Sequence, residues 1–225
     1  TFLGTDYVAH TLEVGDEETL VINLTGLDCT TFLENALVLA RCIKKGTTSF
    51  DDYKNQLQSI RYRNGIIDQY PSRIHYFSDW IYENDKQGIV KDVTKKIGGV
   101  RYDKVINFMS NNTKSYRQLS NEEFVEQIKV FEEEISSRGY YFIPEEKIVS
   151  VEGKINHGDL IAITTNIEGL DIAHVGVAVK KNGRIHFMHA PMVGKKVEIT
   201  EKPLADYVKA NKRQHGIMVA RPLEP

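Results

Sequence analysis

The chain has 225 residues, of which 41% are hydrophobic and 27% are charged, a composition typical of a folded protein with a sizeable core. Its 29 Lys and Arg residues nearly balance its 31 Asp and Glu residues, so the charge does not favour nucleic acid or an anionic membrane as a partner. No uninterrupted apolar run approaches the roughly 18 residues of a transmembrane segment. Two cysteines make no disulfide framework.

The first predicted helix begins beside a cysteine. Residues 19–24 are apolar and β-branched, and they predict a short strand or an extended lead-in. From Phe32 apolar residues recur every three or four positions until Gly46 ends the helix. Cys29 therefore lies at the helix N-terminus, where free N–H groups and the helix dipole favour a thiolate. A buried structural cysteine, which we expect for mid-helix Cys42, is the alternative interpretation of Cys29.

Polar residues predict where three helices begin. Asp28 or Thr30 is expected to cap the cysteine helix, and Ser49 is expected to cap a second helix, because their oxygens can accept first-turn N–H groups. Ser120 and Glu123 have the spacing of a capping box ahead of a third amphipathic helix.

A segment rich in aromatic residues lies between the helix capped by Ser49 and the helix that follows Ser120. A helix is predicted to begin at Pro71 or Ser72. Rings stack on apolar faces and guanidinium groups bind carboxylates, so one side of this helix is a candidate wall for binding sugar or peptide. The alternative is an aromatic helix packed into the core with a surface ion pair. The candidate substrate-binding residues are Arg73, His75, Tyr76, Asp79 and Trp80.

The last part of the chain has the alternation of β-strands. Four short segments are predicted at 159–164, 174–179, 185–190 and 195–199, followed by a helix from Pro203 and a closing strand at 216–221. Turn residues divide the four segments at Asn166/Gly169, at Asn182-Gly183, a strong hairpin turn, and at Val193-Gly194. Helices first and an antiparallel sheet afterwards predict an α+β fold.

Two histidines flank the predicted hairpin turn. A thiol nucleophile needs a base within hydrogen-bond reach and a third group that orients the base. His174 is the candidate base for Cys29, and His189 is the candidate orienting residue, because both lie near the open ends of one hairpin. His186 is three positions from His189, so it is predicted to point to the opposite face of the sheet.

Four motifs together resemble a known family: Asp28-Cys29-Thr30-Thr31-Phe32, Gly158-Asp159-Leu160, His174-Val175-Gly176-Val177 and Phe187-Met188-His189-Ala190. Their order is similar to that of the NlpC-type papain-like peptidoglycan hydrolases. The resemblance implies Cys29 as nucleophile, His174 as base and His189 as the third member. Tyr7 matches the tyrosine whose hydroxyl lies near the cysteine in that family, although His10 and Thr30-Thr31 depart from the pattern.

The resemblance also implies an architecture and a substrate. We expect one papain-like domain over residues 1–225, in which the cysteine helix packs on the C-terminal sheet and a largely helical insertion spans roughly 47–156. The long aromatic insertion resembles the N-acetylmuramoyl-L-alanine amidase branch, which cuts between muramic or anhydromuramic acid and L-alanine. Peptidoglycan or a muropeptide is then the substrate. Neither a cofactor nor a metal ion is expected, because no Cys/His cluster has zinc spacing.

Two alternatives remain open. One is an endopeptidase that cleaves between D-glutamate and the diamino acid of the stem peptide, and the other is a non-catalytic module that binds glycan or peptide. Because the chain begins at Thr1, we expect a removed secretory signal and a location in the periplasm or at the cell surface.

Overall fold

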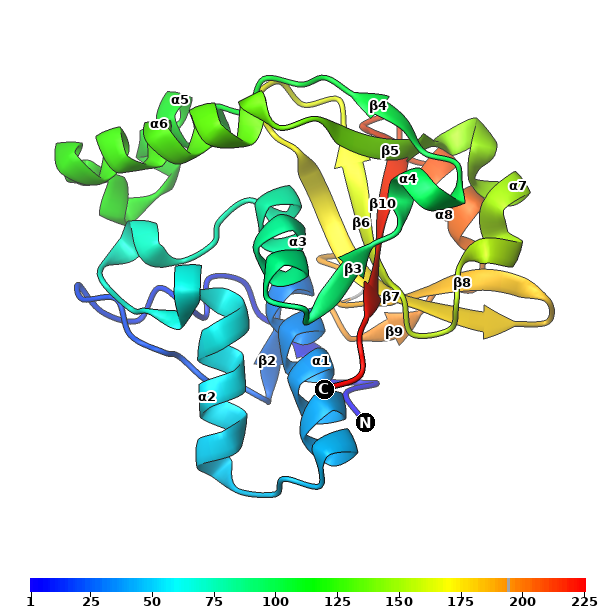
Figure 1. Cartoon of the computed structure of the whole chain (residues 1–225), viewed down its shortest axis with the longest axis horizontal. Helices are drawn as coiled ribbons and strands as arrows, with labels where there is room; N and C mark the ends of the chain where they lie inside the picture. The colour runs from blue at the N-terminus through cyan, green and yellow to red at the C-terminus, as the bar shows by residue number, and fades with distance from the viewer. Residues whose placement is uncertain (194) are drawn as a thin grey trace.

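The structure is a computed structural model that describes residues 1–193 and 195–225. Helices and an antiparallel sheet form a mixed fold (Figure 1). The α-helices are α1 (Cys29–Lys45), α2 (Phe50–Arg61), α3 (Phe77–Lys86), α4 (Thr94–Ile97), α5 (Phe108–Asn111), α6 (Glu122–Ser137), α7 (Ile148–Val151) and α8 (Leu204–Lys209). The strands are β1 (Asp6–Tyr7), β2 (Gly26–Leu27), β3 (Val90–Asp92), β4 (Val100–Tyr102), β5 (Tyr140–Pro144), β6 (Leu160–Thr165), β7 (Ile172–Lys181), β8 (Arg184–His189), β9 (Glu198–Ile199) and β10 (Gln214–Pro222).

The main sheet runs in the order β4-β5-β10-β6-β7-β8-β9, with β3 paired to the far end of β10. The C-terminal strand β10, red in Figure 1, lies inside the sheet and is antiparallel to β6 on one edge. Its other edge pairs first with β5 and then with β3. A separate two-stranded parallel sheet joins β1 to β2, directly before α1.

The two faces of the sheet bury two different cores. Along β6, Leu160 and Ala162 point to the core formed with α1, α2 and α3, whereas Ile161 and Ile163 point to the core formed with α4, α7 and α8. This alternation follows from the two-residue period of a strand, and it explains why β6 is buried on both sides. None of the helices in the described residues is long and apolar enough to cross a membrane.

Local signals in the sequence placed several elements correctly. Asp28 caps α1 by accepting the Thr31 N–H at 2.8 Å, and Gly46 ends that helix with φ 71°. Ser49 caps α2 as predicted. The predicted hairpin turn joins β7 to β8, and its two residues both have positive φ (51° and 77°), as this turn requires.

Of three other local predictions, one was wrong. Residues 19–24 form no strand, which leaves the extended lead-in of the two interpretations, and the carbonyl of Val21 accepts a hydrogen bond from the Arg61 guanidinium. The third long helix is capped by Asn121, because Ser120 donates to the Arg117 carbonyl and belongs to the preceding 3₁₀ turn. The predicted turn at Val193-Gly194 includes Gly194, which lies outside the described residues.

The aromatic segment also folds differently from the prediction. Residues Tyr70–Ser72 form a single 3₁₀ turn, and the chain is then extended until α3 begins at Phe77. The Ile74 N–H donates to the Arg61 carbonyl at 2.9 Å, so this stretch bonds α2 instead of starting a helix. The insertion holds the helices α2 to α7, and it also contributes the short strands β3, β4 and β5 to the main sheet, which the sequence did not indicate.

A buried ion pair ties the cysteine helix to the insertion. Glu34 of α1 and Arg61 of α2 each expose only 2% of their side chains, and the Arg61 Nε lies 2.7 Å from the Glu34 carboxylate. The indole of Trp80 in α3 donates to the second oxygen of the same carboxylate at 3.2 Å. Burial raises the pKa of Glu34, and Arg61 opposes that shift. Each partner therefore depends on the other to remain in the core.

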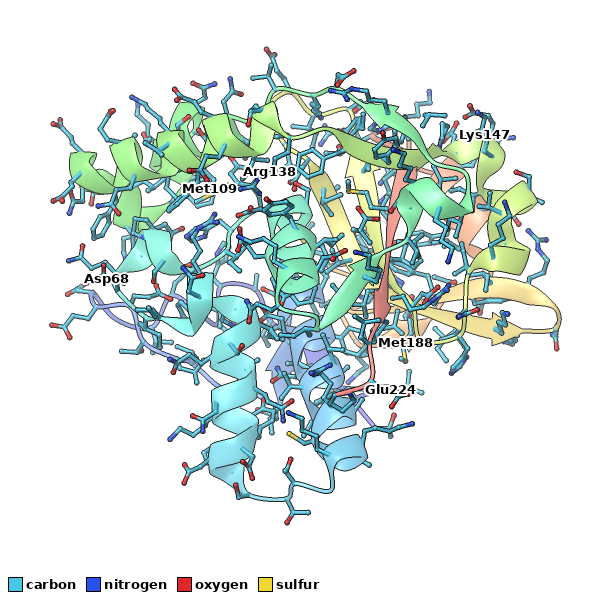
Figure 2. All side chains as sticks on the ribbon, in the orientation of Figure 1. Asp68, Met109, Arg138, Lys147, Met188 and Glu224 are labelled. Atoms are coloured by element: carbon cyan, nitrogen blue, oxygen red, sulfur yellow. The ribbon has the colours of Figure 1, made fainter. Side chains whose placement is uncertain are left out.

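A second ion-pair cluster joins α3 to α6. The buried Asp79 accepts hydrogen bonds from Arg63 and from Arg138, and Arg138 is labelled in Figure 2 above α3. Both guanidinium groups also lie over aromatic rings, Arg63 over Phe131 and Arg138 over Tyr82. These contacts hold the long helix α6 against the insertion.

We predict that Arg61→Met lowers the free energy of unfolding by about 3 kcal/mol, because the Glu34 carboxylate loses its partner in a buried site. Lys54→Met on the same helix is the control, since Lys54 pairs with Asp51 at an exposed position and should change stability by less than about 0.5 kcal/mol. Urea denaturation of the two variants measures both changes. Equal losses in the two variants would contradict the prediction.

Candidate active site

The fold brings the cysteine and the two predicted histidines together from three elements. Cys29 is the first residue of α1, His174 lies near the start of β7, and His189 is the last residue of β8. The backbone N–H of Val175, the residue after His174, lies beside the Cys29 thiol and lowers its pKa. The thiol is therefore held against the strand that carries the candidate base.

The two histidines are directly bonded to each other. The Nε2 atom of His174 lies 2.6 Å from the Nδ1 atom of His189, and the two rings are nearly perpendicular. This bond uses one nitrogen of each ring, so Nδ1 is the nitrogen of His174 left for proton transfer. The pairing of β6 with β7 shifts register beside His174, and such a bulge commonly re-aims side chains next to active sites.

A glycine allows the rings to pack closely. A Cβ atom added to Gly176 would lie 2.7 Å from the Phe187 ring and 2.4 Å from the Met188 carbonyl. Phe187 in turn stacks on His189 with ring centroids 4.7 Å apart. The glycine of the His-Val-Gly motif is thus required so that an aromatic ring can support the orienting histidine.

Burial keeps all three groups neutral at rest. It lowers the pKa of His174 to about 4, and with His174 beside it lowers the pKa of His189 to about 3. Burial and the Asp28 carboxylate raise the pKa of the Cys29 thiol to about 11, although N–H groups of Val175 and Thr30 oppose the rise. The N–H groups at the helix N-terminus do favour the thiolate, but desolvation outweighs them, so the net pKa of the thiol is raised.

Two tyrosines border the thiol. Tyr7 is half-buried, and burial, then Cys29 and Asp28, raise its pKa. Sequence reasoning missed Tyr207 of α8, whose ring packs on His189 with centroids 5.1 Å apart. Burial, Glu198 and Cys29 raise the pKa of Tyr207. It is separated from every motif in the sequence, so no local pattern could have indicated it.

The predicted substrate-binding wall is not a surface. Trp80 and Asp79 expose 1% and 0%, and they are bonded to Glu34 and to two arginines respectively. Tyr76 exposes 4% and donates to Glu132 at 2.6 Å. The alternative interpretation, an aromatic helix packed into the core, describes these residues correctly, because their polar atoms find partners inside the protein.

The remaining two wall residues also have internal partners. Arg73 exposes 5% and lies 2.7 Å from Glu13 and 3.6 Å from Glu18 of the N-terminal segment. The Nε2 atom of His75 lies 2.9 Å from the Tyr70 carbonyl, and burial together with Arg73 lowers the pKa of His75 to about 3. Arg73 joins the N-terminal segment to the insertion and is buried away from the surface, where a ligand would bind.

His186, the histidine predicted to face away, is engaged elsewhere: its Nδ1 lies 2.8 Å from the Thr200 carbonyl. Within residues 1–193 and 195–225, no group of three or more His, Cys, Asp or Glu side chains is arranged to hold a metal ion. The gathered groups, a thiol and two coupled imidazoles, have the chemistry of a cysteine nucleophile with a base and an orienting residue.

Comparison with known proteins gives a family and a set of similar structures. The model of the AmiA-like family, described as N-acetylmuramoyl-L-alanine amidase-like, matches residues 1–217. An N-acetylmuramoyl-L-alanine amidase from Bacteroides uniformis is 37% identical with a TM-score of 0.94, over 99% of this chain and 94% of that one. No curated protein matches the chain.

Two further solved structures are similar. A Bacteroides fragilis protein provisionally named a xylanase is 38% identical with a TM-score of 0.93, over 98% of this chain and 97% of that one. A Legionella pneumophila protein of the family DUF1460 is 23% identical with a TM-score of 0.75, over 99% of this chain and 85% of that one. The last likeness is one of fold alone.

We predict that the resting Cys29 thiol reacts slowly with iodoacetamide at neutral pH. Since the pKa is raised to about 11, the thiolate fraction is small at pH 7 and grows as the pH rises toward 11. In a Cys42→Ala background, alkylation at pH 7 should be at least about tenfold slower than that of free cysteine. A rate that is already maximal below pH 7 would instead indicate a thiolate paired with a charged histidine.

Proposed function

The chain belongs to the N-acetylmuramoyl-L-alanine amidase-like family, and on that premise we propose that it hydrolyses the amide bond between muramic or anhydromuramic acid and L-alanine in peptidoglycan fragments. Cys29 is the proposed nucleophile, His174 the base and His189 the orienting residue. The observation that carries this proposal is the 2.6 Å bond between His174 and His189, formed beside the thiol of Cys29.

The first proposed half-reaction forms a thioester. The Cys29 sulfur attacks the lactyl carbonyl carbon while the thiol proton moves to Nδ1 of His174. Because both groups are neutral at rest, this transfer accompanies the attack. His174 then gives the proton to the leaving nitrogen of L-alanine, and the C–N bond breaks to release the stem peptide.

The negatively charged oxygen of the tetrahedral intermediate needs hydrogen-bond donors that stabilise it. Asp28 already accepts the N–H groups of Thr31 and Phe32, through its side chain and its carbonyl. The proposed oxyanion donors are therefore the N–H groups of Cys29 and Thr30 at the very start of α1, with the nearby hydroxyl of Tyr7.

The second half-reaction hydrolyses the thioester and restores the free enzyme. His174 takes a proton from a water molecule as the water attacks the thioester carbonyl, and the thiol leaves with that proton. The products are a sugar with a free lactyl carboxyl group and a stem peptide with a free amino terminus. This step needs no metal ion, cofactor or redox partner.

Three other activities compete with the proposal. The same thiol and histidines would serve an endopeptidase that cuts between D-glutamate and the diamino acid, and the loss of the predicted sugar-binding wall removes one argument against it. A non-catalytic binding module would not need the His174–His189 bond. The xylanase name of one similar structure implies glycoside hydrolysis, which uses paired carboxyl groups and not a thiol with imidazoles.

The proposed substrate suggests a location. Peptidoglycan and its fragments are met in the periplasm or at the cell surface, so we propose that the protein acts there. The family match supports the substrate class, and the location rests on that substrate alone.

We predict that the purified protein releases the intact stem peptide from muropeptides, and that Cys29→Ala reduces the rate by about 10³-fold or more. Cys42→Ala is the matched control, because the Cys42 sulfur is buried in α1 and accepts from Gln56 at 2.9 Å. It should keep the wild-type rate within about twofold.

Mass spectrometry of the digest identifies the bond. Equal amounts of free stem peptide and of a sugar with a free lactyl group support the amidase. Release of a muramoyl dipeptide would replace it by the endopeptidase, and unchanged digestion by Cys29→Ala would overturn cysteine catalysis altogether.

A further inference from the structure

An acidic residue lies directly across the sheet from the orienting histidine. Strand β9 pairs with β8 so that Glu198 and His189 are opposite partners, and opposite partners project their side chains on the same face. The Glu198 Oε1 atom lies 3.9 Å from the Nε2 atom of His189. Glu198 is half-exposed, whereas the His189 side chain is 1% exposed.

The facing nitrogen of His189 is otherwise unsatisfied. Its Nε2 atom is buried and has no hydrogen-bond partner among the described residues, while its Nδ1 atom is bonded to His174. A buried polar atom without a partner costs free energy, so a group that can satisfy it is expected nearby. The Glu198 carboxylate lies 3.9 Å from this atom, and when ionised it can only accept a hydrogen bond.

The register that brings Glu198 there is fixed by bonds just beyond it. The Thr200 N–H donates to the Phe187 carbonyl at 2.9 Å, and the Phe187 N–H donates to the Thr200 hydroxyl at 3.1 Å. A slip of one residue would turn the carboxylate to the opposite face and break these bonds. The position of Glu198 is therefore built into the sheet and does not depend on a mobile side chain alone.

The shared bond between the two neutral histidines allows two proton arrangements. In the first, His174 donates from Nε2, His189 accepts at Nδ1 and carries its own proton on Nε2. This leaves Nδ1 of His174 free to accept the proton of Cys29. In the second, His189 donates from Nδ1, so His174 carries its proton on Nδ1 and cannot act as a base there.

Glu198 distinguishes these arrangements. In the first, the Nε2–H of His189 points at a carboxylate and is stabilised by it, whereas in the second a nitrogen lone pair faces the same negative charge. We propose that Glu198 is a positioning residue that sets the tautomer of both histidines through His189, so that the free nitrogen of His174 serves Cys29. This inference rests on the proposed cysteine mechanism and adds a fourth member to it.

Other charged and titratable groups lie around this chain of contacts. Tyr207 of α8 packs on His189, and burial, then Glu198 and Cys29, raise the pKa of its hydroxyl. Glu201 and Lys202 line the same shallow cavity as Glu198 and Tyr207. Glu201 is exposed, which makes it a control that removes the same charge from the same surface without facing His189.

The test is Glu198→Gln with Glu201→Gln as its control, both in the full chain labelled with ¹⁵N-histidine. Nuclear magnetic resonance reports which ring nitrogen of His174 and His189 carries the proton, with signals assigned by single histidine substitutions. We expect Nε2–H on both rings in the wild type, and a measurable Nδ1–H population on His189 in Glu198→Gln. The control should match the wild type.

Activity on muropeptides gives a second readout. Glu198→Gln should lower kcat by about three- to tenfold with KM nearly unchanged, because the base is present in the correct tautomer less often. A wild-type His189 protonated on Nδ1, or tautomers unaffected by Glu198→Gln, would overturn the role of Glu198. The tautomer measurement needs no substrate. It therefore tests the role of Glu198 even if muropeptides are not cleaved.

Discussion

The buried carboxylate of Glu34 is the interaction on which the arrangement of this protein depends. It lies in the helix that begins at Cys29, and within the described residues it is bonded by Arg61 of α2 and Trp80 of α3. Because an unpaired carboxylate in this position would be strongly destabilising, the insertion and the cysteine helix must fold against each other. The insertion is therefore part of the scaffold that holds Cys29, and the aromatic residues that resemble a binding wall in the sequence form the interior of that scaffold.

The sequence was informative where a signal is local. The cap at Asp28, the left-handed Gly46 and the Asn182-Gly183 turn depend on neighbouring residues, and each was predicted correctly. The coupling of His174 to His189 could also be predicted, because a hairpin brings its two open ends together. Signals failed where the partner is distant: β3 pairs with residues about 130 positions later, and the burial of Trp80 depends on a glutamate 46 positions earlier. An amphipathic pattern does not indicate which distant residue in the sequence a strand or side chain will contact.

The chemistry of the site depends on exclusion of water as much as on the residues themselves. The helix N-terminus alone favours a thiolate, yet the desolvated sulfur and the two desolvated imidazoles remain neutral. A neutral chain from Cys29 through His174 to His189 can work only if each proton is on the correct nitrogen. Two residues outside the four motifs, Tyr207 and Glu198, lie around His189, where the proposed mechanism needs the proton to be controlled. Family membership supports the class of bond, and the geometry supports the proposed path of the proton.

The central claim is that Cys29 forms a thioester with the lactyl group of muramic or anhydromuramic acid. Rapid quenching of the wild-type enzyme with a muropeptide, followed by intact-mass and peptide-mass analysis, tests it most directly. The proposed mechanism predicts an adduct on the peptide containing Cys29 whose mass equals the sugar acyl group without any amino acid. An adduct that retains L-alanine and D-glutamate, or an adduct on another residue, would contradict it.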